Sequence, residues 1–329
     1  MASNKKRVVV PSIMGAAGWD VLRGREDVES VTFPPTIAAG DFAALLRSND
    51  EVNGVILGLT RFGEAECGVS RGLQVVARIG VGYDTVDVAV LTRHRIPLMV
   101  VGTANSPTVA EQALFMMLAL ARRAAQLDRM VRAGRWSERL STLPADLMGK
   151  TLLIVGFGRI GTRTAKRCLA MEMTVLVYDP YVPADQVRAA GCEPVDDLDA
   201  ALPRADFVSI HCPRTPETEG MFGVARLARM KPTAYLVNTA RGGIIDEAAL
   251  HAALTGGSIA GAGIDVFDRE PPAADNPLLT LDNVVTAPHM AGVSRESIDR
   301  MAAQAVRNVL SVFDGEPIRE NVVNPEVLR

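Results

Sequence analysis

A short apolar strand that runs directly into a glycine-rich turn is the feature that most constrains this chain. The strand is predicted over Thr151–Val155, the turn Gly156–Gly161 reads Gly-Phe-Gly-Arg-Ile-Gly, and a helix is expected to follow to about Met171. In such a unit the first glycine makes a tight turn, the second lets a pyrophosphate approach the backbone, and the third lets the helix pack closely on the strand. The helix N-terminus offers N–H donors and the positive end of its dipole to the anion. The segment therefore predicts a dinucleotide-binding α/β domain.

An acidic residue at the end of the next strand indicates which dinucleotide is favoured. The strand Thr174–Tyr178 ends at Asp179, and an acid is expected roughly 20 residues after the glycine turn in NAD-binding proteins. A carboxylate there accepts hydrogen bonds from both ribose hydroxyls of NAD and repels the 2′-phosphate of NADP. Asp179 can also open a turn with Pro180, and the two roles are compatible. We therefore expect NAD as the cofactor.

Short apolar runs recur along the chain with helical stretches between them. Continuous apolar strands separated by helices indicate parallel sheets that are buried on both faces, which is the α/β class. The strands expected from this pattern are Val8–Val10, Gly54–Leu57, Gln74–Ala77, Thr151–Val155, Thr174–Val177, Phe207–Ile210, Ala234–Val237 and Asn283–Thr286.

Two long helices divide the pattern into two parts. The first is predicted from Ser106 to about Arg132, with either Ser106 as its cap before Pro107 or a capping box of Thr108 and Glu111. The second is predicted over 294–313, ending at Asp314-Gly315. We expect two Rossmann-like, doubly wound parallel-sheet domains joined by these helices. Residues 105–293 would form the NAD-binding domain, and residues 1–104 with 294–329 a discontinuous, flavodoxin-like substrate-binding domain.

Charge and hydropathy exclude several other classes of protein. The formal net charge of −3 gives no electrostatic argument for binding nucleic acid or an anionic membrane. The longest apolar stretch, Ala113 to Ala121, is far shorter than the roughly 20 residues that a bilayer span needs. Near the start, Lys5-Lys6-Arg7 imitates a signal peptide, but Pro11 ends the apolar run that follows, so we expect a charged tail entering a strand.

The cysteines exclude two further kinds of scaffold. They are far apart and form no Cys-x-x-Cys pair, which argues against a disulfide framework or structural zinc. We expect no metal and a reducing, cytoplasmic location for the four residues Cys67, Cys168, Cys192 and Cys212.

Three further segments, 236–243, 263–271 and 286–289, each follow an apolar strand-like run, where open α/β sheets place their ligands. In content, order and spacing they resemble the D-isomer-specific 2-hydroxyacid dehydrogenases, a family that includes phosphoglycerate, glycerate/hydroxypyruvate, glyoxylate and D-lactate dehydrogenases. The resemblance runs from 78–84 (Arg-Ile-Gly-Val-Gly-Tyr-Asp) to 323–325 (Val-Asn-Pro), nearly the whole chain.

The resemblance implies a catalytic role for three residues. Arg241 would bind the substrate carboxylate and carbonyl, because a guanidinium matches two oxygens at once. His289 would be the acid/base, since an imidazole with an ordinary pKa near 6.5 can work in either direction. Glu270 would orient His289 and favour its protonated form. Formate dehydrogenases of this scaffold carry glutamine in place of that glutamate, so Glu270 argues against that branch.

The resemblance also implies contacts to the cofactor and the substrate. Asp265 would contact the nicotinamide carboxamide, Cys212 stands where many relatives have threonine, and His211 is given no proton-transfer role. Substrate contacts are expected from Arg241, His289, Arg78 and the loop residues Val81 and Gly82, while Arg61 could meet a phosphate. The expected cofactor-binding residues are Thr108, Gly156, Gly158, Arg159, Ile160, Gly161, Asp179, His211, Cys212, Pro213, Thr239, Ala240, Arg241, Asp265, His289 and Gly292.

The expected partners are a small 2-hydroxy or 2-keto acid and a second copy of the chain. The segment 132–136 (Arg-Ala-Gly-Arg-Trp) resembles an arm that packs on a partner subunit in the family, and an exposed tryptophan needs a place to bury its ring. The chain ends at Arg329, so no C-terminal regulatory domain of the phosphoglycerate dehydrogenase kind is expected. Alternatives are another NAD enzyme of this scaffold, such as a phosphite dehydrogenase, or a non-catalytic NAD-sensing interaction protein.

Overall fold

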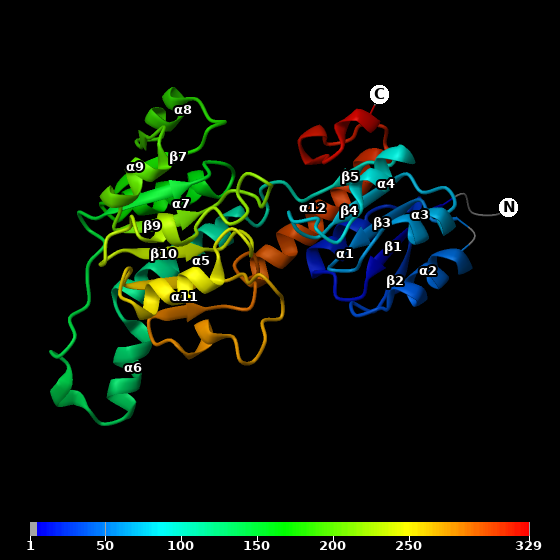
Figure 1. Cartoon of the computed structure of the whole chain (residues 1–329). Coiled ribbons are helices and arrows are strands. Elements are labelled where there is room, and N and C mark those ends of the chain that lie inside the picture. The colour runs from blue at the N-terminus through cyan, green and yellow to red at the C-terminus, as the bar shows by residue number, and fades with distance from the viewer. Residues whose placement is uncertain (1–4, 50, 329) are drawn as a thin grey trace. The chain divides into compact units, whose positions relative to one another are not determined.

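The computed structural model describes residues 5–49 and 51–328 of the chain, which divides into two compact units. The chain passes from one unit to the other between Asn105 and Ser106, and returns between Gly292 and Val293. These points lie next to the predicted domain boundaries. Each unit is an α/β structure built on its own parallel sheet (Figure 1), so the predicted fold class is confirmed.

The first unit is built on a sheet of five parallel strands in the order β2-β1-β3-β4-β5. This is the flavodoxin-like order that the sequence predicted. The strands are β1 (Lys6–Pro11), β2 (Val28–Phe33), β3 (Gly54–Leu57), β4 (Val75–Arg78) and β5 (Leu98–Met99). The helices are α1 (Ala16–Arg23), α2 (Ala39–Ser48), α3 (Glu64–Val69), α4 (Val88–Arg93) and α12 (Arg295–Phe313), with short 3-10 turns at Arg319–Asn321 and Pro325–Val327.

Burial on both faces explains why these strands are continuously apolar. Val8 and Val10 pack into the core beneath α12, whereas Val9 between them packs into the core on the opposite face. Successive side chains of a strand point to opposite faces, so a strand covered on both sides has no polar position. The helix α12 begins with the Ser294 side chain accepting the Ser297 N–H, and ends at Asp314, as predicted.

The second unit is built on seven parallel strands in the order β12-β11-β10-β9-β6-β7-β8. Strand order reverses between β6 and β9, which is where doubly wound sheets bind ligands. The strands are β6 (Thr151–Val155), β7 (Thr174–Tyr178), β8 (Glu193–Pro194), β9 (Phe207–Ile210), β10 (Tyr235–Asn238), β11 (Gly261–Ile264) and β12 (Val284–Thr286). The helices are α5 (Ser106–Ala121), α6 (Ala124–Arg132), α7 (Gly161–Ala170), α8 (Ala184–Ala189), α9 (Leu198–Ala201), α10 (Val224–Leu227) and α11 (Glu247–Thr255), with 3-10 turns at Trp136–Glu138, Leu202–Arg204 and Pro277–Thr280.

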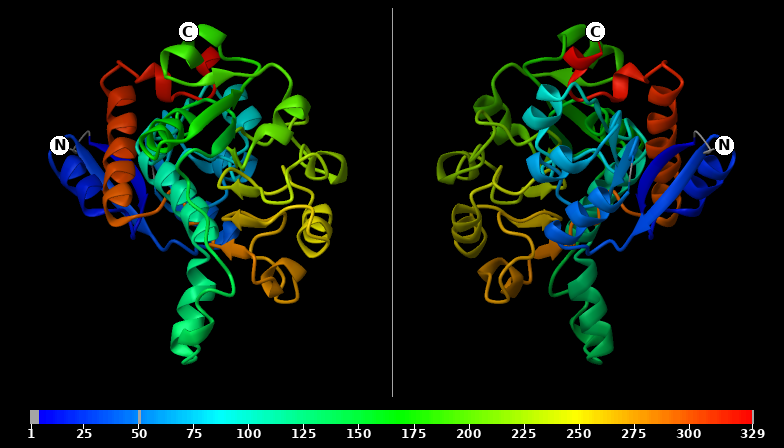
Figure 2. Two further views of the ribbon diagram at one scale, coloured as in Figure 1. Left: turned by 90° about the vertical axis from the view of Figure 1, so that its left-hand side faces the viewer. Right: turned by 90° about the vertical axis from the view of Figure 1, so that its right-hand side faces the viewer.

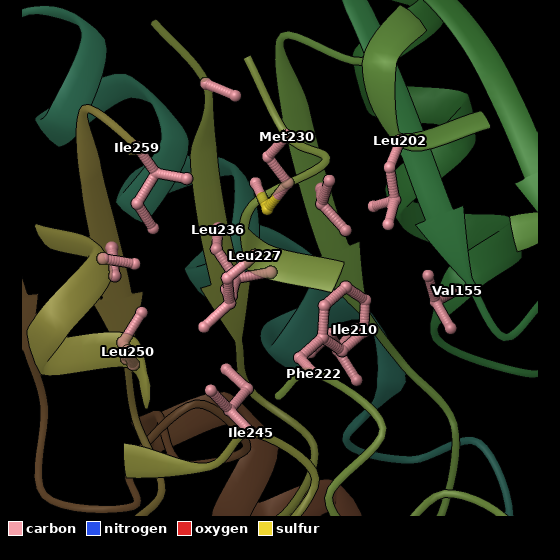
Figure 3. Close-up of a cluster of buried hydrophobic side chains, with 14 of the residues drawn as sticks. Val155, Leu202, Ile210, Phe222, Leu227, Met230, Leu236, Ile245, Leu250 and Ile259 are labelled. Atoms are coloured by element: carbon pink, nitrogen blue, oxygen red, sulfur yellow. The ribbon is translucent and has the colours of Figure 1, made fainter. Parts of the chain in front are cut away.

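One core of this unit lies between the sheet and the helices that follow β9 and β10. Figure 3 shows Ile210 of β9 and Leu236 of β10 facing Leu227 and Leu250 of the covering helices. All four side chains are essentially inaccessible to solvent. This packing fixes the carboxyl ends of the strands, from which the predicted site residues project.

The long helix predicted from Ser106 to Arg132 is wrong, because Arg123 has φ = 51° and breaks it into α5 and α6. A residue in the left-handed region ends a helix, but no glycine or proline marks this position in the sequence. The helix already includes Ser106, whose hydroxyl is buried without a hydrogen-bond partner, so Ser106 does not cap it. Thr108 also lies inside α5, and Glu111 accepts from Arg167 Nη2 at 2.9 Å.

Candidate active site

The glycine turn has the geometry of a phosphate cradle. A Cβ on Gly161 would lie 2.1 Å from the carbonyl oxygen of Gly156, and one on Gly156 would lie 2.6 Å from the Cys212 nitrogen. Gly156 also has φ = +98°, a conformation that side chains disfavour. A Cβ on Gly158, in contrast, meets nothing within 4 Å. The first and third glycines are therefore needed for packing, and the second faces open space that a pyrophosphate could occupy.

Asp179 is fastened to this turn through its carboxylate. Oδ2 accepts from the Phe157 N–H at 2.7 Å, and Oδ1 accepts from the Tyr181 N–H at 2.9 Å. Each carboxylate oxygen can accept more than one hydrogen bond, so both can still bind ribose hydroxyls. The arrangement puts a fixed negative charge beside the glycine turn.

Directly after β9, two titratable side chains are partly buried in their uncharged forms. His211 Nε2 lies 2.9 Å from the Ser209 hydroxyl, and burial lowers the pKa of the ring to about 3. Burial raises the pKa of the Cys212 thiol to about 11. Near neutral pH the imidazole has no extra proton to donate and the thiol is not a nucleophile. Both side chains can line a cofactor site without adding charge to it.

The loop that carries Arg241 is held rigidly from two sides. The buried Asn238 accepts from the Ala240 N–H at 3.0 Å and donates to the Arg241 carbonyl at 2.8 Å. On the other side, a Cβ on Gly242 would lie 1.9 Å from the Phe267 carbonyl oxygen, so only glycine fits there. Asn238 is a positioning residue that we did not assign from the sequence. The sequence signal for Asn238 was its position as a polar residue at the end of an otherwise apolar strand.

His289 and Glu270 form a direct pair, with His289 Nδ1 2.6 Å from Glu270 Oε2. The other carboxylate oxygen of Glu270 accepts from the Phe267 N–H at 3.1 Å, so the glutamate is fixed by its own loop. The His289 and Glu270 side chains are 47% and 36% exposed. The pair can therefore exchange a proton with a bound molecule through the free Nε2 edge of the ring.

Asp265 holds the backbone around His289. It is fully buried, and its two carboxylate oxygens accept the Met290 and Ala291 N–H groups, each at 2.8 Å. Its carbonyl accepts the His289 N–H at 2.8 Å. His289 has φ = 54°, and such left-handed backbone at a bulky residue persists where surrounding bonds enforce it. The nicotinamide contact expected of Asp265 stays a prediction.

In the first unit, Arg78 and the loop after it lie at the carboxyl end of β4. Arg78 Nη1 donates to the Ile79 carbonyl at 2.7 Å. The guanidinium folds over Gly80, where an added Cβ would lie 2.5 Å from Nη1. Arg61 is exposed, in the segment after β3. The substrate contacts expected of Arg78, Val81 and Gly82 stay predictions.

Known proteins match the chain along most of its length. The sequence model described as "D-isomer specific 2-hydroxyacid dehydrogenase, NAD binding domain" matches residues 114–291. The D-3-phosphoglycerate dehydrogenase of Archaeoglobus fulgidus is 41% identical over 258 residues, which are 78% of this chain and 49% of that protein. The glyoxylate reductase of Thermofilum pendens is 37% identical over 333 residues, covering 99% of this chain and 96% of that one. The crystal structure of a glyoxylate reductase from Paecilomyes thermophila has a TM-score of 0.86 at 27% identity, over 98% of this chain and 99% of that chain.

The matched segment and the relative of nearly equal length decide the family. The chain belongs to the D-isomer specific 2-hydroxyacid dehydrogenases. The resemblance seen in the sequence is thereby confirmed, and residues 114–291 belong to the NAD-binding domain of this oxidoreductase family. The chain spans about half the length of the D-3-phosphoglycerate dehydrogenases that it matches, between 48% and 52% of three of them.

The residues of this 2-hydroxyacid dehydrogenase domain fit an NAD molecule. The open side of Gly158 and the anchored Asp179 suit the pyrophosphate and the ribose. Two buried polar atoms among the expected cofactor residues, Thr239 Oγ1 and His211 Nδ1, have no hydrogen-bond partner. Buried polar atoms are nearly always bonded, so these two fit a polar ligand. Among the described residues, no group of three or more His, Cys, Asp or Glu side chains is placed to hold a metal ion.

Alanine substitutions at two glycines should separate cofactor binding from folding. Because the space beside Gly158 is open, Gly158→Ala should change the free energy of unfolding by less than about 1 kcal/mol. It should weaken NADH binding at least tenfold, about 1.4 kcal/mol. Gly161→Ala forces a methyl group against the Gly156 carbonyl and should cost about 1–3 kcal/mol of stability. Denaturant unfolding and NADH fluorescence titration measure the two effects; wild-type NADH affinity in Gly158→Ala would contradict the cradle.

Proposed function

We propose that the chain is an NAD-dependent dehydrogenase acting on a small 2-hydroxy or 2-keto acid, of the glyoxylate, hydroxypyruvate or 3-phosphoglycerate type. The observation that carries this proposal is the 2.6 Å contact between His289 and Glu270. It lies in the same unit as the glycine turn and Arg241. A histidine paired with a carboxylate suits a reaction that moves a proton together with a hydride, which NAD-binding alone does not require.

The proposed chemistry assigns one task to each of the three side chains. The bound cofactor would supply a hydride acceptor for the alcohol carbon as NAD, or a hydride donor for the carbonyl carbon as NADH. Arg241 binds the substrate carboxylate through two parallel N–H bonds and orients the neighbouring carbonyl. His289 donates a proton to the carbonyl oxygen as that oxygen becomes an alkoxide, and takes the proton back in the reverse direction. Glu270 stabilises the protonated ring and fixes its orientation.

The choice of substrate depends on residues of the first unit. Arg78, Val81 and Gly82 are proposed to contact the acid, because a guanidinium and the backbone N–H groups of a glycine-containing loop both suit a carboxylate. Arg61 is a candidate for a phosphate or a second carboxylate because it is the exposed cation after β3. The relatives named glyoxylate reductase and D-3-phosphoglycerate dehydrogenase support both substrate types.

The proposed function is tested by a panel of NADH-oxidation assays. The substrates are glyoxylate, hydroxypyruvate, pyruvate, 2-ketoisocaproate and 3-phosphohydroxypyruvate, each repeated with NADPH. We expect turnover of at least one 2-keto acid with NADH and a clear preference over NADPH. Absence of turnover with every acid, in protein that binds NADH, would favour the non-catalytic NAD-sensing alternative. Arg61→Ala should lower kcat/KM only for the phosphorylated acid if Arg61 binds phosphate.

Glu270→Gln should narrow the pH range of keto-acid reduction from the alkaline side. Reduction needs a protonated His289, and the neutral amide no longer favours the imidazolium. The upper pH limit of activity should therefore fall. The pH–rate profile of kcat/KM measures this limit. Asp275→Asn, which changes an exposed acid in the same segment, is the control and should leave the profile unchanged.

We also propose that the chain forms a homodimer in the cytoplasm, through the arm that starts with α6. Figures 1 and 2 show α6 extending away from the sheet of its own unit. The arm exposes Trp136 by 63%, Leu140 by 72% and Leu143 by 70%, and exposed apolar clusters of this kind mark protein interfaces. The four cysteines are free, as a reducing compartment requires. No helix among the described residues combines the length and apolarity of a membrane span.

The dimer prediction is tested by sedimentation of the wild type and of one triple variant. Replacing Trp136, Leu140 and Leu143 by serine should halve the measured mass, because the arm loses the apolar surface that a partner would bury. Val224→Ser is the control, since Val224 is equally exposed, by 70%, but lies on α10. A monomeric wild type, or a variant that stays dimeric, would contradict the arm as the interface.

A further inference from the structure

Two exposed side chains, Tyr181 and Glu217, are joined above the carboxyl end of the second unit's sheet. The Tyr181 hydroxyl donates to Glu217 Oε2 at 2.6 Å, although the tyrosine is 77% exposed. Tyr181 follows β7, whereas Glu217 lies in the loop after β9. An exposed contact of this kind adds little to the stability of the fold, so we consider a role for it in ligand binding. We call this pair the clasp.

The strand order places the clasp across the glycine turn. Strand β6 pairs with β7 on one side and with β9 on the other. A bond between the segment after β7 and the segment after β9 must therefore pass over the segment after β6. That segment is the glycine turn Gly156–Gly161. The clasp consequently spans the place where the sheet offers its phosphate cradle.

Both ends of the clasp are anchored at their backbones. On the β7 side, the Tyr181 N–H donates to Asp179 Oδ1 at 2.9 Å, the carboxylate expected to bind the adenosine ribose. On the β9 side, the buried Thr218 hydroxyl donates to the Pro213 carbonyl at 2.6 Å and accepts the Thr215 N–H at 2.8 Å. The turn that carries Glu217 is thereby fixed, so its side chain meets Tyr181 from a rigid backbone.

Two carboxylates, those of Glu217 and Asp179, act on the clasp. Hydrogen bonding to Glu217, together with the charges of Glu217 and Asp179, raises the pKa of the Tyr181 hydroxyl, so both carboxylates act on the same phenol. The basic residue of this loop, Arg214, is paired with Glu219. A 2′-phosphate of NADP bound beside Asp179 would therefore meet two acids. An aromatic ring next to them offers a flat apolar surface to an adenosine.

We propose that Tyr181 and Glu217 close over the adenosine half of the bound dinucleotide, and that Glu217 acts with Asp179 to exclude NADP. This inference rests on the proposed use of NAD and names Glu217 as a second determinant of that specificity. The two members have separate tasks. Tyr181 retains the cofactor by covering it, while Glu217 fixes the tyrosine and supplies the charge that repels a 2′-phosphate.

Equilibrium binding of NADH and NADPH to three variants tests the proposal without relying on catalysis. Glu217→Gln keeps an acceptor for the Tyr181 hydroxyl but removes the charge, so NADPH should bind about three- to tenfold more tightly while NADH affinity stays within about twofold. Tyr181→Phe keeps the ring but releases it, so NADH and NADPH should both dissociate several-fold faster. Asp185→Asn is the control, because it removes an exposed charge from α8, and it should alter neither affinity.

The outcomes separate this inference from the proposed function. If the wild type binds NADH and Glu217→Gln leaves the ratio of NADPH to NADH affinity unchanged, Glu217 is not a determinant of specificity. If Tyr181→Phe leaves both dissociation rates unchanged, the clasp does not cover the cofactor. If the wild type binds neither dinucleotide, the proposed function itself fails, and the clasp with it. Fluorescence titration gives the affinities, and stopped-flow displacement gives the dissociation rates.

Discussion

Gly161 approaches the carbonyl of Gly156 so closely that any side chain at position 161 would overlap it. This approach lets α7 begin directly behind β6 and brings the start of the helix to the edge of the sheet. The loop after β9 closes on the same turn, since the Cys212 nitrogen lies against Gly156. Two neighbouring loops and one helix thus depend on the absence of side chains at two positions. The cradle, the anchored Asp179 and the clasp are all built around that contact.

A second part of the site follows from strand register. In the sheet, Asn238 is level with Ile264, and Ile264 is level with Thr286. The residues that follow these positions therefore leave the sheet at the same height. This places the loops of Arg241, Glu270 and His289 side by side, although they are far apart in sequence. Because parallel strands all end at one edge, three separate loops can build one site.

The strands predicted from the sequence are those with continuous runs of large apolar residues. The strand β2 was not predicted, because it lies at the edge of its sheet and carries the partly exposed Glu29 and the exposed Thr32. The strand β11 was not predicted either, since it reads Gly-Ala-Gly-Ile and lacks β-branched residues until its end. Its glycines have a packing reason that only the structure gives: a Cβ on Gly263 would lie 2.9 Å from Met116 of α5. The close contact between β11 and α5 requires glycines, although glycine has a low propensity for strands.

Some residues of the candidate site could be named from the sequence, and others could not. Motif and family resemblance were enough to name His289 and Glu270, because both follow predicted strands in the order and spacing of the family that the chain resembles. Their supports could not be named, since Asn238 acts through backbone groups and Tyr181 meets Glu217 only through the order of the strands. A residue that touches a ligand leaves a recurring pattern in sequence. A residue that only holds another residue in place can be replaced by many different contacts. No fixed sequence pattern therefore marks it.

Glu270 and Asp265 both lie beside His289, but they differ in burial and therefore in the role that each can have. Glu270 is partly exposed and contacts the ring, so it can respond to a change in the charge of the histidine. Asp265 is fully buried, and burial raises the pKa of its carboxyl group while the Met290 and Ala291 N–H groups oppose that shift. Protonation of Asp265 would weaken the bonds that hold His289 in its left-handed backbone. In the proposed mechanism, the proton-transfer task therefore falls to the exposed pair of His289 and Glu270, and the buried Asp265 keeps that pair in place.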